Sequence, residues 1–585
     1  MNTILAPLRE LGEYEDIQKQ LNTQQGKVSI SGCVDSQKLH MIYGFTEKYD
    51  VKLIVTYSDM KAKELLDDCK LYCRESYYFP AKDLIFYQAD IHSNQLIKER
   101  VAVLRKLLEG EPITIVTTFS ALMAHQLPLS VWQENVIEIE EGGIAEEAAI
   151  ARQLVKMGYE KNYQVEAPGQ FSVRGGIVDI FDLTRENPVR IELWGDEVES
   201  IRSFDIESQR SIEKLTEVSI YPATELILSK KALEDGLARM EKDCKKSAAF
   251  FREETKPEEA HRLEQAVAEL KEQVTQFQSF VNLESYIGYF YEETQSLVDF
   301  VADRKLCICL DEPARIEEHA NAVELEFRES MSTRAEKGYI LPEQMNVLYG
   351  AREIYARLDK NRLLALSTME YKGFPVKFQN RYAVNARNVS SYNNSFPELV
   401  KDLNHYKKNG YRVLLVSASS TRAKRLATDL MDEGLNAFYS DNSQRELQPG
   451  EIMTFYGNVL KGFEYPMLKF VVISESDIFG KQNRKKKKKK VYEGQKIRDF
   501  SDLKIGDYVV HENHGLGIYK GIEKVEVDKV VKDYIKIEYR DGGNLYILAT
   551  GLDVIQKYAS ADAAKRPKLN KLGTQEWTKT KSKVT

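Results

Sequence analysis

The residues best placed to do chemistry stand at the end of the first apolar segment. Residues 27–33 (KVSISGC) predict a short strand, and a helix is expected to begin within 34–44. This is the layout of a phosphate-binding loop, which needs G-x-x-x-x-G-K-[ST]: glycines for the turn, Lys for phosphate and a hydroxyl for Mg²⁺. This chain has SGCVDSQK at that position. Ser31, Gly32 and Lys38 are what remains of the motif, and Asp35 would repel phosphate. No Gly-Lys-Ser/Thr triplet occurs in the chain, so we predict that this loop does not bind ATP.

A second candidate for ATP chemistry is the pair Asp311-Glu312. It follows Lys305–Leu310 (KLCICL), which predicts a buried strand, and carboxylates at that place hold Mg²⁺ and the attacking water in an ATPase. Pro313 and Arg315 follow instead of the residues that a helicase uses. Since the Lys partner is missing, we interpret the pair as a degenerate remnant or an ordinary surface pair.

The stretch Gln170–Asp205 offers binding chemistry instead. Two β-branched runs separated by Gly175-Gly176 predict a hairpin, and 189–194 and 198–204 alternate apolar and polar residues as half-buried strands do. Arg174 and Arg190 are expected near Trp194, and Arg and Trp supply much of the binding energy where proteins meet. On composition alone, two solvated arginines and a core tryptophan are the favoured alternative.

The bulk composition sets limits on these possibilities. At roughly 150 residues per domain, 585 residues suggest about four domains, and a net charge of -7 excludes a wholesale basic nucleic-acid binder. The six cysteines show no zinc-site spacing, so we expect reduced thiols and no metal site. There is neither a secretory signal nor an apolar run of about 18 residues, which favours a cytoplasmic protein without membrane contact.

Two parts of the chain alternate strands with helices, which predicts parallel sheets covered on both faces. The first has strands at 51–57 and 113–118, a helix at 58–75 and a long amphipathic helix at 253–283. The second spans about 395–480, with strands at 412–418, 437–439, 451–455 and 470–474 and a helix at 421–433.

The last part of the chain has a different composition. The run at 484–490 (RKKKKKK) cannot bury anything and marks a linker. From Leu503 to Tyr558, four or five short strand candidates in under sixty residues predict a small barrel, a type of module that usually binds partners.

Four blocks of sequence, taken in order, resemble one known family. They are FPAKDLIFYQADIH (Phe79–His92), RGGIVDIF (Arg174–Phe181), RIELWGDEVESIRSFD (Arg190–Asp205) and GDYVVHENHGLGIYKGI (Gly506–Ile522). The first three resemble the damage-recognition protein UvrB, and the last resembles an RNA-polymerase-binding barrel. In this combination the chain is similar to the N-terminal half of the bacterial transcription-repair coupling factors (Mfd).

The resemblance implies an α/β multidomain fold. Residues 1–125 and 215–385 would form a degenerate helicase-like (RecA/UvrB-like) parallel-sheet domain, interrupted at 126–214 by an inserted β-rich UvrA-binding domain. The remaining parts would be a small α/β domain at 386–480, a basic linker at 481–500, a Tudor-like (CarD-like) barrel at 501–560 and the start of a connector at 561–585.

The resemblance also implies a function in transcription-coupled nucleotide excision repair. The family protein recognises RNA polymerase stalled at DNA damage, releases it by ATP-driven translocation and recruits UvrA. The UvrA contacts fall on Arg174, Arg190 and Trp194, where many relatives carry Phe at the last place. The contact with the polymerase β subunit falls on Val525, with Lys524 and Glu526 beside it.

The family's ATPase modules lie after the barrel, beyond Thr585, so a truncated product that keeps docking but lacks the motor is expected. It would have no catalytic residues and no cofactor, because ATP, Mg²⁺ and double-stranded DNA belong to the translocase. We expect a monomer whose UvrA surface is open. Two alternatives remain: a UvrB-type ATP-dependent damage-binding enzyme, and a CarD-like transcription regulator that uses only the barrel.

Overall fold

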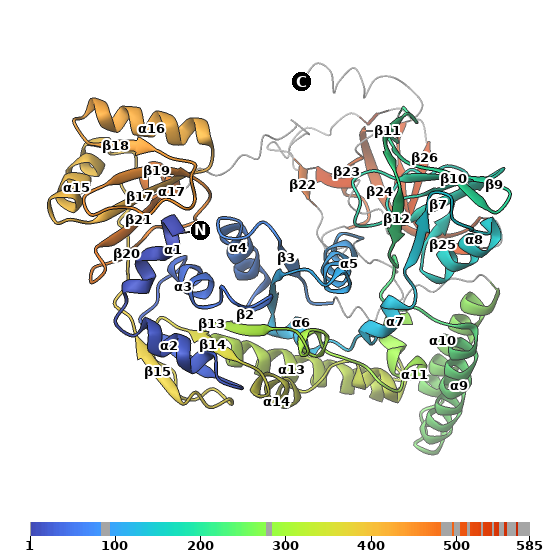
Figure 1. Cartoon of the computed structure of the whole chain (residues 1–585). Helices are drawn as coiled ribbons and strands as arrows, with labels where there is room; N and C mark the ends of the chain where they lie inside the picture. Colours follow the sequence, from blue (N-terminus) through green and yellow to red (C-terminus); the bar gives the residue numbers. More distant parts are fainter. Residues whose placement is uncertain are drawn as a thin grey trace.

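The computed structural model describes most of the chain (Figure 1). The described residues are 2–82, 94–206, 208–276, 283–480, 494–496, 504–511, 515–527, 530–540, 543–548, 555–558 and 569–570. The basic run at 484–490 and residues 83–92 of the first family-like block lie outside them. Among the described residues, no helix is long and apolar enough to cross a bilayer.

A seven-stranded parallel sheet forms the centre of the molecule. Its strands come from two separate parts of the chain, before residue 120 and after residue 305. In spatial order they are β15 (Asn380–Ala383), β1 (Lys27–Ser31), β14 (Leu363–Leu366), β13 (Leu306–Asp311), β2 (Val51–Thr56), β4 (Ile113–Thr118) and β3 (Ser76–Phe79).

This sheet is buried on both faces, as parallel sheets usually are. Successive residues of β13 show it: Ile308 belongs to one hydrophobic core, and its neighbours Cys307 and Cys309 belong to another. The Ile308 core includes α13 (Pro313–Glu336) and α14 (Ala351–Asp359), and the cysteine core includes α3 (Gln37–Phe45) and α4 (Asp59–Cys69). Both cysteines are free thiols.

The other helices of this part are shorter or lie at its edge. They are α1 (Asn2–Leu5), α2 (Tyr14–Leu21), α5 (Asn94–Glu109), α6 (Phe119–Met123), α7 (Leu129–Gln133), α9 (Lys230–Glu253), α10 (Pro257–Gln276), α11 (Ile287–Phe290) and α12 (Leu297–Val301), with 3-10 turns η1 (Ala6–Glu10), η2 (Leu283–Tyr286) and η3 (Pro342–Asn346).

Two of the predicted helices are wrong in extent. The helix expected over 58–75 ends at Cys69, because Ser76–Phe79 pairs with β4 as strand β3. The helix expected over 253–283 is instead the second half of an α9–α10 hairpin. Thr255 takes a left-handed φ of 59° at the break, and Pro257, which cannot donate a helical hydrogen bond, begins α10.

The stretch Gln170–Asp205 lies in a separate six-stranded sheet, and its four strands match the predicted runs. The order is β11 (Ser211–Leu215), β10 (Glu197–Phe204), β9 (Val189–Trp194), β8 (Ile177–Ile180), β7 (Gln170–Arg174) and β6 (Glu160–Lys161), antiparallel except for β6 and β7. Helix α8 (Glu147–Lys156) covers one face. Next to the sheet, β5 (Ile137–Glu140) pairs with β12 (Glu217–Ile220).

The second α/β part also forms one six-stranded sheet. It contains the predicted strands β17 (Arg412–Ser417), β18 (Ala437–Tyr439), β19 (Ile452–Tyr456) and β21 (Phe470–Ser474), all parallel. Two strands that the sequence did not suggest extend it: β20 (Phe463–Tyr465) pairs antiparallel with β21, and β16 (Arg387–Asn388) pairs antiparallel with β20 at the edge. Its helices are α15 (Phe396–Lys408), α16 (Ser420–Asp432) and α17 (Glu475–Phe479).

The C-terminal part is an antiparallel sheet of six strands. In order they are β22 (Gly494–Lys496), β27 (Ile555–Tyr558), β23 (Tyr508–His511), β24 (Gly515–Val527), β25 (Val530–Glu538) and β26 (Asn544–Leu548). The chain is therefore a mixed α/β protein with one fully parallel sheet and several β-rich sheets, as the sequence predicts at that level of detail.

Candidate functional site

The arginines predicted as binding residues meet on a carboxylate that the sequence reasoning did not single out. Asp179 on β8 pairs directly with Arg190 on β9, and Arg174 lies on the neighbouring strand β7. Arg190 donates from Nε to Asp179 Oδ1 at 2.7 Å and from a terminal nitrogen to Oδ2 at 2.9 Å. Arg174 donates to the same Oδ2 at 2.9 Å. One carboxylate therefore holds both guanidinium groups side by side.

Asp179 is only 1% exposed, and the two arginines are the cations that cover it. The hydrogen bonds to Asp179 raise the pKa of Arg190 above its ordinary value, against the opposing effect of burial. The Arg190 guanidinium also lies 4.4 Å from the centre of the Phe204 ring and donates to Gln209. Its conformation is thus fixed before any partner arrives, which lowers the entropy cost of binding.

Trp194 ends the same strand and faces the same side. Along β9, residues Ile191 and Leu193 are buried, whereas Arg190 and Trp194 belong to the opposite, outer face. Arg190 and Trp194 are four residues apart, which at the rise of a β-strand separates them by about 13 Å along β9. Trp194 is 78% exposed, so its interpretation as a core ring is wrong. The interpretation of the arginines as solvated is also wrong, because both are bound to Asp179.

The outer face has a second exposed ring that the sequence reasoning missed. Tyr163, in the loop after β6, is exposed, and its ring centre lies 5.8 Å from the Arg174 guanidinium carbon. A cation over a tyrosine face is a favourable contact that partial desolvation strengthens. The signal for Asp179 was present in the sequence, since a charged residue at the centre of a predicted apolar strand needs a partner of opposite charge.

The second predicted site, the phosphate-loop remnant, is occupied by the protein itself. Lys38 Nζ donates to Asp311 Oδ1 at 2.7 Å and to Glu312 Oε1 at 2.6 Å. Thr56 donates to the other oxygen of Asp311 at 2.8 Å. The statement that the lysine partner is missing is therefore wrong, and so is the interpretation of the acids as a surface pair: Asp311 is 2% exposed.

Lys38 and Glu312 stabilise each other's charged form. Burial opposes the charged form of Lys38, but the two carboxylates outweigh it and raise the pKa of Lys38. Burial likewise opposes ionisation of Glu312, and Lys38 outweighs it and lowers the pKa of Glu312. Glu312 also accepts hydrogen bonds from the backbone and hydroxyl of Thr368 while holding a left-handed φ of 59°.

The turn before α3 is covered by a loop from the second α/β part. Lys461 Nζ donates to Asp35 at 2.7 Å, and the Lys461 backbone donates to Ser36. Asp68, at the end of α4, accepts from the Ser36 hydroxyl at 2.6 Å and from the Leu460 backbone at 2.8 Å. Thus the surface that would face a phosphate is used for contact between two parts of the chain.

The same contact includes a buried histidine and a shared core. His40 donates through Nε2 to the Ile4 carbonyl at 2.8 Å and accepts through Nδ1 from the Tyr465 hydroxyl at 2.9 Å. Burial lowers the pKa of His40 to about 4, which keeps it neutral at physiological pH. Side chains of α3 and of β20 and β21 belong to one hydrophobic core, as their proximity in Figure 1 suggests.

This contact should make stability depend on pH through Asp68. Burial raises the pKa of Asp68 to about 7, against the opposing effect of its hydrogen bonds. Between about pH 4 and about pH 7 the folded chain keeps a proton that the unfolded chain has released, so stability falls as pH rises through this window and then levels off.

Asp68→Asn should raise the free energy of unfolding relative to the native protein, and this gain should be larger at about pH 8 than at about pH 5. Urea unfolding of both proteins at the two pH values measures it. The histidines are common to both and cancel in the difference. A difference in stability that does not change with pH would contradict the assignment.

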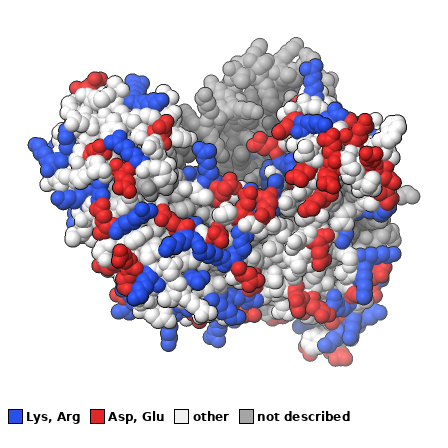
Figure 2. Space-filling model, in the orientation of Figure 1, with Lys and Arg blue, Asp and Glu red and all other residues white. Residues whose placement is uncertain are grey.

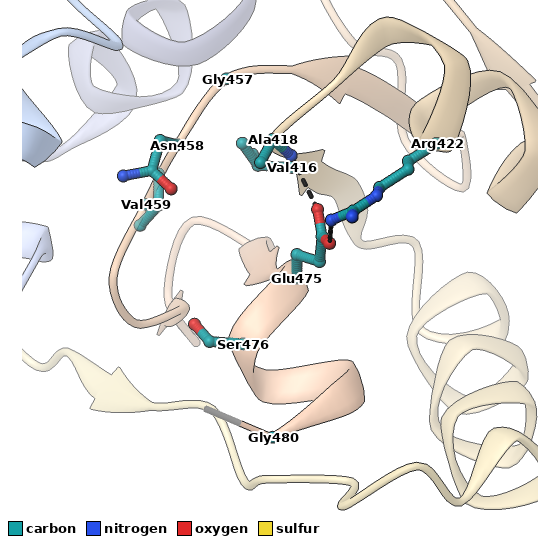
Figure 3. A pocket seen from close by; sticks show the side chains of 9 residues that line it. All are labelled: Val416, Ala418, Arg422, Gly457, Asn458, Val459, Glu475, Ser476 and Gly480. Atoms are coloured by element: carbon teal, nitrogen blue, oxygen red, sulfur yellow. Dashed lines mark hydrogen bonds and ion pairs between the residues drawn. The ribbon is translucent and has the colours of Figure 1, made fainter. Parts of the chain in front are cut away.

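A pocket of about 90 Å³ lies at the carboxyl end of the second parallel sheet (Figure 3). Such an edge is where open α/β sheets bind ligands, and the first turn of α16 borders it. However, the anion position there is filled: Glu475 accepts from the Ala418 backbone at 2.8 Å and forms an ion pair with Arg422. The described residues contain no group of three or more His, Cys, Asp or Glu side chains arranged to hold a metal.

The residues predicted to bind polymerase lie in the β24–β25 ladder. Lys524, Val525 and Glu526 are opposite Asp533, Lys532 and Val531. Their side chains are outside what the structure describes. Figure 2 shows lysines and arginines intermixed with aspartates and glutamates over the visible face, in keeping with the net charge of -7.

Two segments match known domain families. Residues 137–226 match the UvrB interaction domain, and this range includes the whole arginine–Asp179 cluster and Trp194. Residues 503–559 match the CarD-like/TRCF RID domain, which includes strands β23 to β27.

The whole chain is similar to curated proteins of one name. It is 35% identical over 590 residues to the transcription-repair-coupling factor of Bacillus subtilis (strain 168), covering 100% of this chain and 49% of that protein. It is 30% identical over 565 residues to the protein of the same name from Staphylococcus haemolyticus (strain JCSC1435), covering 95% of this chain and 47% of that protein. The chain thus spans about half the length of these relatives.

Proposed function

We propose that the chain docks two proteins in transcription-coupled nucleotide excision repair. The premise is its homology, along its whole length, to the transcription-repair-coupling factors. One partner is UvrA, and the other is RNA polymerase stalled at DNA damage. The observation that carries the proposal is the outer face around Asp179, where two fixed guanidinium groups lie on the same face as an exposed Trp194.

Contact rather than catalysis is the role that this geometry supports for the described residues. Lys38 already binds Asp311 and Glu312, and Lys461 with its backbone covers the turn where phosphate would bind. In this proposal ATP, Mg²⁺ and duplex DNA are handled by translocase modules of the longer relatives. The second candidate, a UvrB-type enzyme, would be favoured by ATP turnover that Glu312→Gln abolishes.

The UvrA part of the proposal has a direct test. Purified UvrA is titrated against the immobilised chain, and a saturable complex is expected at about micromolar concentration or below, as for a specific interface. Absence of binding by the native chain would overturn the proposed function. A monomeric, cytoplasmic chain with the seven segments set out from the sequence is part of the same proposal.

The C-terminal sheet is proposed to close into a Tudor-like barrel that binds the polymerase β subunit. The match of 503–559 to an RID domain and the long antiparallel hairpin β24–β25 support this. Lys524, Val525 and Glu526 are the proposed contacts, with Val525 supplying the apolar one.

Val525→Arg should therefore lower the affinity for RNA polymerase by about tenfold or more, as loss of an apolar interface contact does. Pull-down of the core enzyme by native and variant chains measures it. UvrA binding by the same variant is the control and should be unchanged. If polymerase binding also stays unchanged, the contact lies elsewhere on the sheet.

A further inference from the structure

The outer face that carries the arginine pair continues past Trp194 to another exposed apolar side chain, Ile144. Glu197 pairs with Trp194 across the β9–β10 hairpin, and Ile144 forms an antiparallel bridge with Glu197. Partners in such a ladder point to the same face of a sheet. Trp194, Glu197 and Ile144 therefore form one row, with the two apolar side chains about 10 Å apart, or two strand spacings.

Both apolar side chains are held outward by an ordered backbone. Ile144 is 81% exposed and Trp194 is 78% exposed. The segment that carries Ile144 is tied to the hairpin on both sides: Ala145 N donates to the Asp196 carbonyl at 2.7 Å, and Val198 N donates to the Gly143 carbonyl at 2.9 Å. Two large apolar side chains presented outward on one face, next to the arginine pair, are a pattern of protein-binding surfaces.

Charge indicates what kind of partner fits beside this row. Two guanidinium groups share the single carboxylate of Asp179, so the cluster keeps one unmatched positive charge. Glu192, on the same face, is already paired with Arg202. A partner surface should thus present a carboxylate to the Arg174–Arg190 pair and an apolar depression to the Trp194–Ile144 row, with a donor opposite the exposed Glu197.

We propose that Ile144 is a contact residue of the UvrA docking surface and that it enters the same apolar depression as Trp194. This inference rests on the proposed function, since it commits to UvrA as the occupant of the face. It enlarges the surface from the arginine pair and one ring to a strip that spans β7, β8, β9, β10 and the 142–145 segment.

The test is Ile144→Arg in the full chain, titrated with purified UvrA. Because Ile144 is exposed, the variant should fold with an unchanged melting temperature, and UvrA affinity should fall by about 10- to 100-fold. Leu325→Arg is the matched control: Leu325 is 55% exposed on α13, outside the inserted sheet, and its replacement should leave UvrA affinity unchanged.

Arg174→Glu separates failure of this inference from failure of the proposed function. If Arg174→Glu loses UvrA and Ile144→Arg does not, the docking face ends at Trp194 and the inference is wrong. If neither change affects binding, UvrA docks elsewhere and the whole face around Asp179 is wrongly assigned, whereas only the absence of UvrA binding by the native chain overturns the proposed function. Replacing both Ile144 and Trp194 by Ala should cost less binding free energy for UvrA than the sum of the two single replacements, because both side chains fill one depression. Strictly additive losses of binding free energy would contradict the shared depression.

Discussion

Replacing Lys38 by Met should lower the free energy of unfolding by about 3–5 kcal/mol, the cost of leaving a buried ionic group without its partner. Asp311 and Glu312 would lose hydrogen bonds of 2.7 and 2.6 Å and keep two negative charges together in the interior. Urea unfolding followed by circular dichroism measures the loss. Lys70→Met is the matched control, because Lys70 is paired with Asp67 at 3.0 Å and both side chains are more than half exposed, a type of pair worth about 0–1 kcal/mol.

The triple replacement of Lys38, Asp311 and Glu312 by Met, Asn and Gln should recover much of this loss. It removes the unpaired charges while keeping the volume, and buried ion pairs are often dispensable when all partners are replaced together. A Lys38→Met variant as stable as the native chain would show that the carboxylates find other partners or bind a proton instead.

Arg174→Glu should reduce affinity for UvrA by about 100-fold or more, the range found for central arginines of interfaces. The new carboxylate would stand beside the buried carboxylate of Asp179, and repulsion would turn it away from the cluster. Arg190 would still neutralise Asp179, so the fold should survive. Surface plasmon resonance with immobilised UvrA gives the affinity, and thermal unfolding checks the fold.

Two further variants make that result specific to the site. Arg152→Glu reverses the charge of an exposed arginine on α8 in the same part of the chain, and should leave affinity unchanged. Arg174→Lys keeps the charge but loses the planar fork that can bind Asp179 and a partner at once, and should give an intermediate loss. Equal binding by the native and Arg174→Glu chains would rule out the face around Asp179 as the UvrA site.

The sequence predicts local structure well where pattern and chemistry agree. The alternation in 189–194 and 198–204 matches β9 and β10, because one face of that sheet packs on α8 and the other meets solvent. The Gly175-Gly176 hairpin also matches, since both glycines take a positive φ, 57° and 83°, that other residues rarely adopt. From this register Arg190 and Trp194 could be placed on one face.

Contacts between distant segments could not be predicted in this way. Lys38 and Asp311 are 273 residues apart, and only the order of the strands brings them together. The absence of a Gly-Lys-Ser/Thr motif led to the inference that Asp311 and Glu312 have no lysine partner. A motif describes only neighbours along the chain, so it could not show that Lys38 reaches them. Composition alone favours a core position for Trp194 for a similar reason, although the family resemblance implies a UvrA contact: its type favours burial, and its place on the outer face at the end of β9 exposes it.

The loop at Leu460–Lys461 has a consequence for how this molecule can move. In a motor, the arrangement of two lobes changes each time a nucleotide enters, is cleaved and leaves. Here the cation that reaches Asp35 belongs to the polypeptide, so it is neither consumed nor exchanged. The ion pair between Lys461 and Asp35, and the hydrogen bonds of Ser36 and Asp68 to the same loop, therefore join the two lobes without a bound ligand.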